Sequence, residues 1–326
     1  MADTKIPTNL LEFSQQFHTE QACVDFLINL RWPEGFLCSR CGAKQGHRLK
    51  TRKIIECTDK SCSYQASVTA GTVMHRSKQD LRIWFWGAYL VSTLTTGMSA
   101  VQFQRQLGLS RYETAYNILH KLRSALVAPG REPLLNEVEV DEAYIGGKEE
   151  GRPGRGTKKK VLVVCAVELI RWVDKKTEAE RVRSGRIRLR FIPDAASKSL
   201  IPFVKENIKT GSIIHTDGWA GYSPLSKESY DHQVVIQGRG KKAIYMPHVH
   251  HIFSNLKSWL NGTYHGGVQE KHIQAYLNEF VYRFNRRYWR GPAFKRALGL
   301  ATEMECGPTY ESLYKAGNPG GWLHPG

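Results

Sequence analysis

Four cysteines in two close pairs carry the clearest chemistry in the chain. Two residues separate Cys38 from Cys41, four separate Cys57 from Cys62, and fifteen lie between the pairs. Four thiolates form the usual tetrahedral shell of a structural zinc ion, and the segment between the pairs is long enough for a hairpin that returns the second pair to the first. The spacing therefore predicts a zinc ribbon holding one Zn²⁺, with four unrelated buried cysteines as the alternative.

Two acidic residues form the second chemical feature. Asp141 follows the alternating stretch EVEV, and Asp217 follows the apolar stretch SIIHT, so each is expected to close a β-strand. An aspartate at a strand end is commonly just a turn former. Two on neighbouring strands are also what two-metal phosphoryl transfer requires, because convergent carboxylates hold Mg²⁺ or Mn²⁺ ions close together. We expect the adjacent glutamates, Glu137, Glu139 and Glu142, to be strand-face or ion-pair residues.

The charge of the chain indicates a polyanionic partner. Its 326 residues include 47 Lys and Arg against 30 Asp and Glu, a formal net charge of +17. Such an excess favours many weak phosphate contacts, and therefore nucleic acid over acidic lipid. The most apolar stretch, Ile83 to Leu94, is too short to cross a bilayer, and the first residues lack an apolar signal segment. We therefore expect a soluble intracellular protein.

Helical patterns dominate the first half outside the cysteine region. Apolar spacing predicts helices over 10–30 and 80–92, then two short helices within 98–126, capped by Ser99 and Ser110 and joined at Gly108. This last pair matches a helix-turn-helix, with a plain helical hairpin as the alternative. In the first reading the DNA-facing residues at the start of the second helix are Arg111, Tyr112 and Asn117.

The second half has a mixed pattern. After a polar break at 127–133, it predicts strands over 137–141, 161–169, 186–193 and 212–217, and helices over 197–208, 251–260 and 270–287. The charged stretch 171–185 is expected to be a turn. This order is typical of a ribonuclease H-like (retroviral integrase-like) α/β domain. We expect four segments: a leading helix and zinc ribbon (1–78), a helix-turn-helix (79–130), the ribonuclease H-like core (131–305) and a flexible tail (306–326).

Several longer stretches resemble one family. QASVTAGTVMH, VDEAYIGGK, HTDGWAGY, VHHIFSNLKSWLNGTYHGG and YLNEFVYRFNRR are similar to segments of Merlin-related bacterial insertion-sequence transposases, over about Cys38 to Arg287. The resemblance implies a zinc ribbon, a helix-turn-helix and a DDE-type catalytic core that nicks DNA and transfers strands with Mg²⁺ or Mn²⁺. It further implies double-stranded DNA (terminal repeats and target) as partner, a homo-oligomer in the DNA complex, and a location in the bacterial cytoplasm at the nucleoid.

The third catalytic position departs from the DDE pattern. A Glu is expected about three dozen residues after Asp217, but PHVHHIFSNLK contains no carboxylate. His250 lies seven residues before Lys257, so both share a helix face, as the third ligand and its basic partner usually do. Asn255 is the alternative, since relatives are described with Asn there and an amide oxygen suits Mg²⁺ better than imidazole. The sequence leaves both open, with Lys257 expected at a DNA phosphate.

Other basic residues are candidates for a DNA-backbone surface, namely Lys241, Lys242, Arg283, Arg286 and Arg287. Two other functions stay open. A zinc-ribbon transcription regulator needs no catalytic half, and a transposase-derived DNA-binding protein that has lost catalysis fits the missing glutamate.

Overall fold

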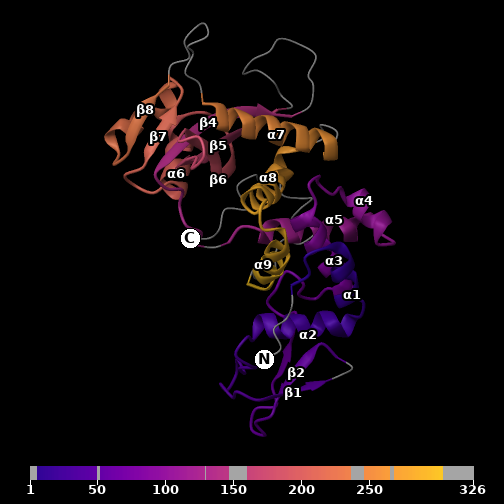
Figure 1. Ribbon diagram of the computed structural model, residues 1–326. Coiled ribbons are helices and arrows are strands. Elements are labelled where there is room, and N and C mark those ends of the chain that lie inside the picture. Colours follow the sequence, from indigo (N-terminus) through magenta and orange to yellow (C-terminus); the bar gives the residue numbers. More distant parts are fainter. Residues whose placement is uncertain are drawn as a thin grey trace. The chain divides into compact units, whose positions relative to one another are not determined.

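The computed structural model describes residues 6–49, 52–128, 130–146, 160–235, 246–264 and 268–303. These form two compact units, one from residues 6–128 with 286–303 and the other from residues within 130–285 (Figure 1). The division differs from the expected segments, because residues 286–303 belong with the N-terminal unit and not with the core. Lys241, Lys242 and the expected tail (306–326) lie outside the described residues.

The N-terminal unit begins with two helices and a small sheet. Helices α1 (Leu10–Gln16) and α2 (Glu20–Arg31) precede the antiparallel strands β1 (Gly46–Leu49), β2 (Ile54–Cys57) and β3 (Gln65–Ser67). The single helix expected over 10–30 is wrong. The Thr19 side chain accepts a hydrogen bond from the Ala22 N–H and starts a new helix, because a capping side chain satisfies an amide that lacks an intrahelical partner.

Four further helices complete this unit: α3 (Leu81–Thr93), α4 (Ala100–Gln106), α5 (Tyr112–Ala125) and α9 (Arg290–Glu303). The helix expected over 80–92 and the helix pair within 98–126 are confirmed, and Gly108 turns the chain between α4 and α5 with a φ of 62°. Ser99 caps α4 as expected. The cap expected at Ser110 is wrong, since α5 begins one residue later and has no side-chain cap.

The sequence did not predict α9. Its Phe294 is fully buried and packs against the rings of Phe13, Phe17 and Phe85. Burial of large rings contributes much of the apolar stabilisation of a core, so the Phe294 contacts tie α9 to the N-terminal unit.

The second unit is built on one mixed sheet. Its strands are β4 (Glu137–Ile145), β5 (Val161–Val173), β6 (Glu180–Ile192), β7 (Ile213–Thr216) and β8 (Asp231–Val234), in the order β6-β5-β4-β7-β8. β4, β5 and β6 are antiparallel, whereas β7 lies parallel to β4 and β8 parallel to β7. The turn expected over 171–185 is wrong for most of its length, because Ile170–Val173 pair with Glu180–Arg183 and extend both strands. β8 was not predicted.

Helices cover both faces of the sheet. α6 (Ser197–Asn207) and the 3-10 helix η1 (Ala220–Lys227) pack on one face with Val138 and Val140 of β4. α7 (Pro247–Tyr264) and α8 (Glu270–Asn285) pack on the other, with Ile145. Side chains alternate along a strand, so Glu139 and Asp141 lie on the α7 and α8 face. Asp141 does not close its strand as expected but lies in the middle of β4.

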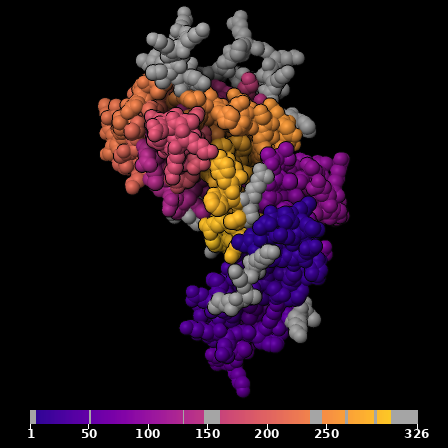
Figure 2. All heavy atoms as spheres, in the orientation of Figure 1, coloured from indigo at the N-terminus to yellow at the C-terminus, as the bar shows by residue number. Residues whose placement is uncertain are grey.

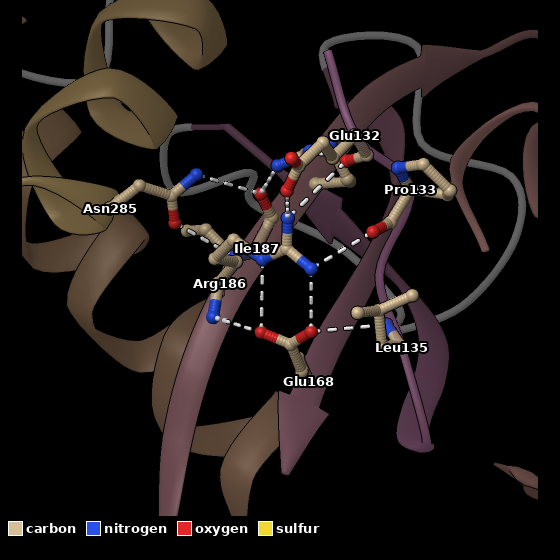
Figure 3. A network of polar contacts seen from close by, with 8 residues as sticks. Glu132, Pro133, Leu135, Glu168, Arg186, Ile187 and Asn285 are labelled. Carbon is tan, nitrogen blue, oxygen red and sulfur yellow. Dashed lines mark hydrogen bonds and ion pairs between the residues drawn. The ribbon is translucent and has the colours of Figure 1, made fainter. Parts of the chain in front are cut away.

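A network of polar contacts joins the segment before β4 and the end of α8 to strands β5 and β6 (Figure 3). The carboxylate of Glu168 on β5 accepts hydrogen bonds from the Leu135 N–H and from the backbone and guanidinium of Arg186 on β6. Arg186 also donates to the Pro133 carbonyl. At the end of α8, Asn285 accepts a hydrogen bond from the Ile187 N–H and donates one to the Ile187 carbonyl. The segment that leads into β4 and the end of α8 are thus both held by β6.

None of the helices in the described part of the chain has the length and apolar character that a bilayer span requires.

Candidate functional site

Asp141 and Asp217 lie on neighbouring strands. β4 and β7 are parallel, with Val138 opposite Ile214 and Glu139 opposite His215. The same offset carried two residues further places Asp141 opposite Asp217, which directly follows β7. Each aspartate is oriented locally, since the Glu142 N–H donates to Asp141 Oδ1 (2.8 Å) and the Trp219 N–H donates to Asp217 Oδ1 (3.0 Å).

The electrostatics of Asp141 are those of a crowded, buried acid. Its side chain is 13% exposed. Burial raises its pKa to about 6, the Asp217 carboxylate adds to the rise, and the Glu142 amide and Lys257 ammonium oppose it. A carboxylate pair of this kind repels itself in the absence of a cation, so the arrangement fits a bound divalent ion.

Helix α7 brings His250 to this pair. His250 Nδ1 lies 3.7 Å from Asp141 Oδ2, and the imidazole is 43% exposed. The positive charge of Lys257, two helical turns further on, lowers the pKa of the same carboxylate. Asn255 is half-buried, and at 100° per residue it lies about 140° around the helix axis from His250. The packing of α7 therefore brings His250 and Lys257 near Asp141, beside which Asp217 lies, and leaves Asn255 on another side of the helix.

Glu139 is a residue of this region whose contact the sequence did not predict. It is 4% exposed, and its Oε2 accepts a hydrogen bond from the Val249 N–H at 2.8 Å, in the first turn of α7. Burial raises its pKa to about 7, opposed by the amides of Val249 and His248. The only signal in the sequence is a glutamate flanked by two buried valines, which predicts an acid inside a covered sheet but not its partner.

The neighbouring acids and histidines have other partners. Glu137 forms two hydrogen bonds with the Arg171 guanidinium, and its Oε1 lies 2.8 Å from His215 Nε2. Glu142 accepts a hydrogen bond from the Tyr222 hydroxyl at 2.7 Å. The expectation that these two acids are strand-face or ion-pair residues is confirmed, and His215, two residues before Asp217, contacts Glu137.

The four ribbon cysteines converge at one end of the small sheet. Their Sγ atoms all lie within 4.8 Å of one another, with Cys38 to Cys62 at 3.8 Å and Cys41 to Cys57 at 3.6 Å. Tetrahedral zinc with bonds of about 2.3 Å separates its sulfur ligands by about 3.8 Å. Gly42 and Ser63, which follow the two pairs, both have positive φ, as a chain that wraps around an ion requires. The cluster fits Zn²⁺.

The other candidate DNA contacts have varied surroundings. Arg111 is exposed just before α5, Tyr112 is half-buried, and the Asn117 amide oxygen is buried without a hydrogen-bond partner in the described part of the chain. Arg283 lies inside the second unit, 9% exposed and ion-paired with the fully buried Glu279. Such a residue is positioned to brace α8 more than to meet DNA.

The turn between α8 and α9 carries the remaining candidates. Arg286 and Arg287 lie there, followed by Tyr288 and Trp289, which are 67% and 69% exposed. The Arg287 guanidinium lies 4.7 Å from the centre of the Tyr288 ring. Neither aromatic residue is among the candidates predicted from the sequence, although both stand beside a run of arginines.

Comparisons with known proteins agree with this architecture. Residues 133–285 match the family model of the ISXO2-like transposase domain, and residues 18–65 match that of the transposase zinc-ribbon domain. An uncharacterized protein in transposable element ISH50 of Halobacterium salinarum is 28% identical over 309 residues, which is 88% of this chain and 97% of the relative. An uncharacterized transposase-like protein of Haemophilus influenzae is 25% identical over 96 residues, 29% of this chain and 76% of the relative. With a zinc-ribbon match at 18–65 followed by a transposase-domain match at 133–285, the chain belongs to the IS1595 family of insertion-sequence transposases.

Proposed function

We propose that this protein is an active DNA transposase that binds the terminal repeats of its element and catalyses metal-dependent DNA cleavage and strand transfer. The observation that carries the proposal is the register of the parallel strands β4 and β7, whose continuation brings Asp217 beside Asp141, with His250 next to Asp141. Three antiparallel strands, a helix and a strand parallel to the first support a ribonuclease H-like (integrase-like) core of the DDE type.

Asp141, Asp217 and His250 would hold the catalytic cations, Mg²⁺ or Mn²⁺. Carboxylate oxygens are the ligands that these hard ions prefer, and a cation would offset the repulsion between the two acids. Bound there, such ions would lower the pKa of the attacking water or 3′-hydroxyl and stabilise the leaving oxygen. His250 takes the place of the usual glutamate, in preference to Asn255, because its imidazole lies 3.7 Å from the Asp141 carboxylate.

The remaining side chains of the site would position DNA. Lys257 is exposed on the His250 face of α7, so its ammonium can hold a phosphate next to the carboxylates. α7 also contributes to the surface of its unit, as Figure 2 shows, so a duplex can reach this helix. The Lys257 ammonium also favours the ionised form of Asp141, because a positive charge lowers the pKa that burial raises.

DNA recognition is assigned to the N-terminal unit. We propose that α4 and α5 act as a helix-turn-helix, in which the exposed Arg111 and the half-buried Tyr112 and Asn117 face base edges, while the ribbon and Arg286 and Arg287 contact the backbone. The charge of +17 supports strong, salt-dependent binding. We further propose that a homo-oligomer assembles on the paired terminal repeats.

The decisive experiment measures nicking of labelled terminal-repeat DNA with Mg²⁺ or Mn²⁺. Asp141→Asn and Asp217→Asn keep side-chain size but remove the charge that offsets two cations, so cleavage should fall at least about 100-fold while DNA binding persists. Asp231→Asn is the matched control, because Asp231 is exposed at the far end of the neighbouring strand β8, and it should cleave normally.

Wild-type cleavage by Asp141→Asn would overturn the mechanism. A wild-type protein that binds terminal repeats but never nicks them would favour the second candidate function, a DNA-binding protein derived from a transposase.

A further inference from the structure

We propose that Glu139 is a positioning residue, whose buried carboxylate holds the first turn of α7 against β4 and thereby sets His250 beside Asp141. The inference rests on the proposed function, since it assigns Glu139 a role in shaping the cation site.

The contact itself is a hydrogen bond from helix to strand. Glu139 Oε2 accepts from the Val249 N–H at 2.8 Å, and the carboxylate is almost fully excluded from water. Val249 is the third residue of α7, where backbone N–H groups have no intrahelical acceptor. An acidic group at this end of a helix is also favoured by the helix dipole. Without an acceptor there, a buried amide would lose its hydrogen bond.

The position of this contact links it to the candidate site. Glu139 and Asp141 are two residues apart on β4, so their side chains leave the same face about 7 Å apart. Val249 and His250 are consecutive on α7. Consecutive residues of α7 therefore contact the two acids, Val249 through its backbone amide at Glu139 and His250 through its imidazole at Asp141. A slide of the helix end by about 1 Å would change the His250 distance directly.

Other contacts do not replace this one. Val249 and Ile252 bury their side chains in the core, but apolar packing is not directional and permits small slides. His248 Nδ1 lies 3.0 Å from Ser184 Oγ on β6, which fixes a side chain on the preceding residue. In the described part of the chain, the Glu139 carboxylate joins the backbone of α7 to the strand that bears Asp141, through the Val249 amide and with the His248 amide also directed at it.

A positioning role makes a specific prediction for three variants. Glu139→Gln keeps an oxygen acceptor at the same reach and removes the charge. Glu139→Asp keeps the charge and withdraws the acceptor by one methylene. Glu139→Met keeps the bulk and removes the acceptor. If the acceptor positions the helix, Gln should preserve the site and both Asp and Met should loosen it.

The test is Mn²⁺ binding to the full-length, zinc-loaded protein without DNA, measured by electron paramagnetic resonance. The comparison uses only the Mn²⁺ binding that is lost in the Asp141→Asn variant. Glu139→Met and Glu139→Asp should weaken it about 10-fold or more, as loss of an outer-shell contact typically does, and Glu139→Gln should stay within about threefold of wild type. Glu137→Gln is the control, since Glu137 lies two residues before Glu139 on the same face of β4 but bonds Arg171 and His215, and the Mn²⁺ affinity of this variant should be unchanged.

Outcomes separate this inference from the proposed function. If the wild-type protein has no Asp141-dependent Mn²⁺ site, the proposed function fails and the role of Glu139 with it. If the site is present but folded Glu139→Met binds Mn²⁺ like wild type, only the inference is overturned. If Glu139→Met does not fold, the other two variants decide. Wild-type Mn²⁺ affinity in Glu139→Asp together with weakened affinity in Glu139→Gln would overturn the acceptor role.

Discussion

His250 Nδ1 on α7 lies 3.7 Å from Asp141 Oδ2 on β4. This distance is too long for a good hydrogen bond, and it exceeds by less than about 1 Å the separation of about 3.0 Å between adjacent ligands of an octahedral ion with bonds of about 2.1 Å. A small approach of the imidazole would therefore let His250 and Asp141 share one cation, and the role of each residue can be tested directly.

Substitutions on α7 distinguish the two candidate third ligands. His250→Ala should reduce cleavage of terminal-repeat DNA about 100-fold or more, and His250→Glu should restore part of it because Glu supplies a hard carboxylate oxygen. Asn255→Ala should have a mild effect, since Asn255 lies on another side of the helix. A strong loss in Asn255→Ala together with an active His250→Ala would assign the role to Asn255 instead. Nicking rates at saturating Mn²⁺ give the comparison.

The pKa of Asp141 predicts a gain in stability on its removal. A carboxyl group whose pKa is higher in the folded chain than in the unfolded chain lowers stability as pH rises between the two values. For a rise from 3.8 to about 6 the loss is complete above about pH 7 and is on the order of 3 kcal/mol. Asp141→Asn should therefore raise the melting temperature of the Mg²⁺-free, zinc-loaded protein, and by more at pH 8 than at pH 5. Calorimetry that finds the same gain at both pH values would contradict this cause.

Zinc content tests the ribbon. The purified protein should hold about one zinc ion per chain, because four thiolates complete one tetrahedral shell. Cys57→Ser should lower the zinc content and destabilise the N-terminal unit. Cys23→Ser removes a cysteine that is buried away from the cluster and should leave the zinc content unchanged. Equal metal content in the wild-type and Cys57→Ser proteins would rule out the assignment.

The Glu168 network should be a measurable contributor to the second unit. Glu168→Ala leaves the Arg186 guanidinium and the Leu135 N–H without their acceptor. We expect a loss on the order of 2–3 kcal/mol in urea unfolding, less than for a fully buried pair because Arg186 is partly exposed. Glu180→Ala removes an exposed partner of Arg171 on the same strand pair, and it should change stability by less than about 1 kcal/mol. Similar losses in the two variants would show that the network has no special role.

Local patterns in the sequence predicted much of this protein. The cysteine spacing predicted the ribbon cluster, and the alternation of Glu137, Val138, Glu139 and Val140 predicted a strand that carries Asp141. The seven-residue spacing of His250 and Lys257 placed both on one helix face. Each of these features depends on residues close together in the chain, so periodicity and ligand spacing suffice to find it.

Tertiary packing decided the rest. Ile170–Val173 became strand because Glu180–Arg183 pair with them, and charge alone had indicated a turn. α9 joined the N-terminal unit because Phe294 packs against Phe13 and Phe17, nearly the whole chain away. The side of α7 that meets Asp141, and the burial of Glu139 beneath its first turn, likewise follow from contacts across more than a hundred residues. Such contacts leave no periodic mark in the sequence, because their partners are chosen by the shape of the folded chain.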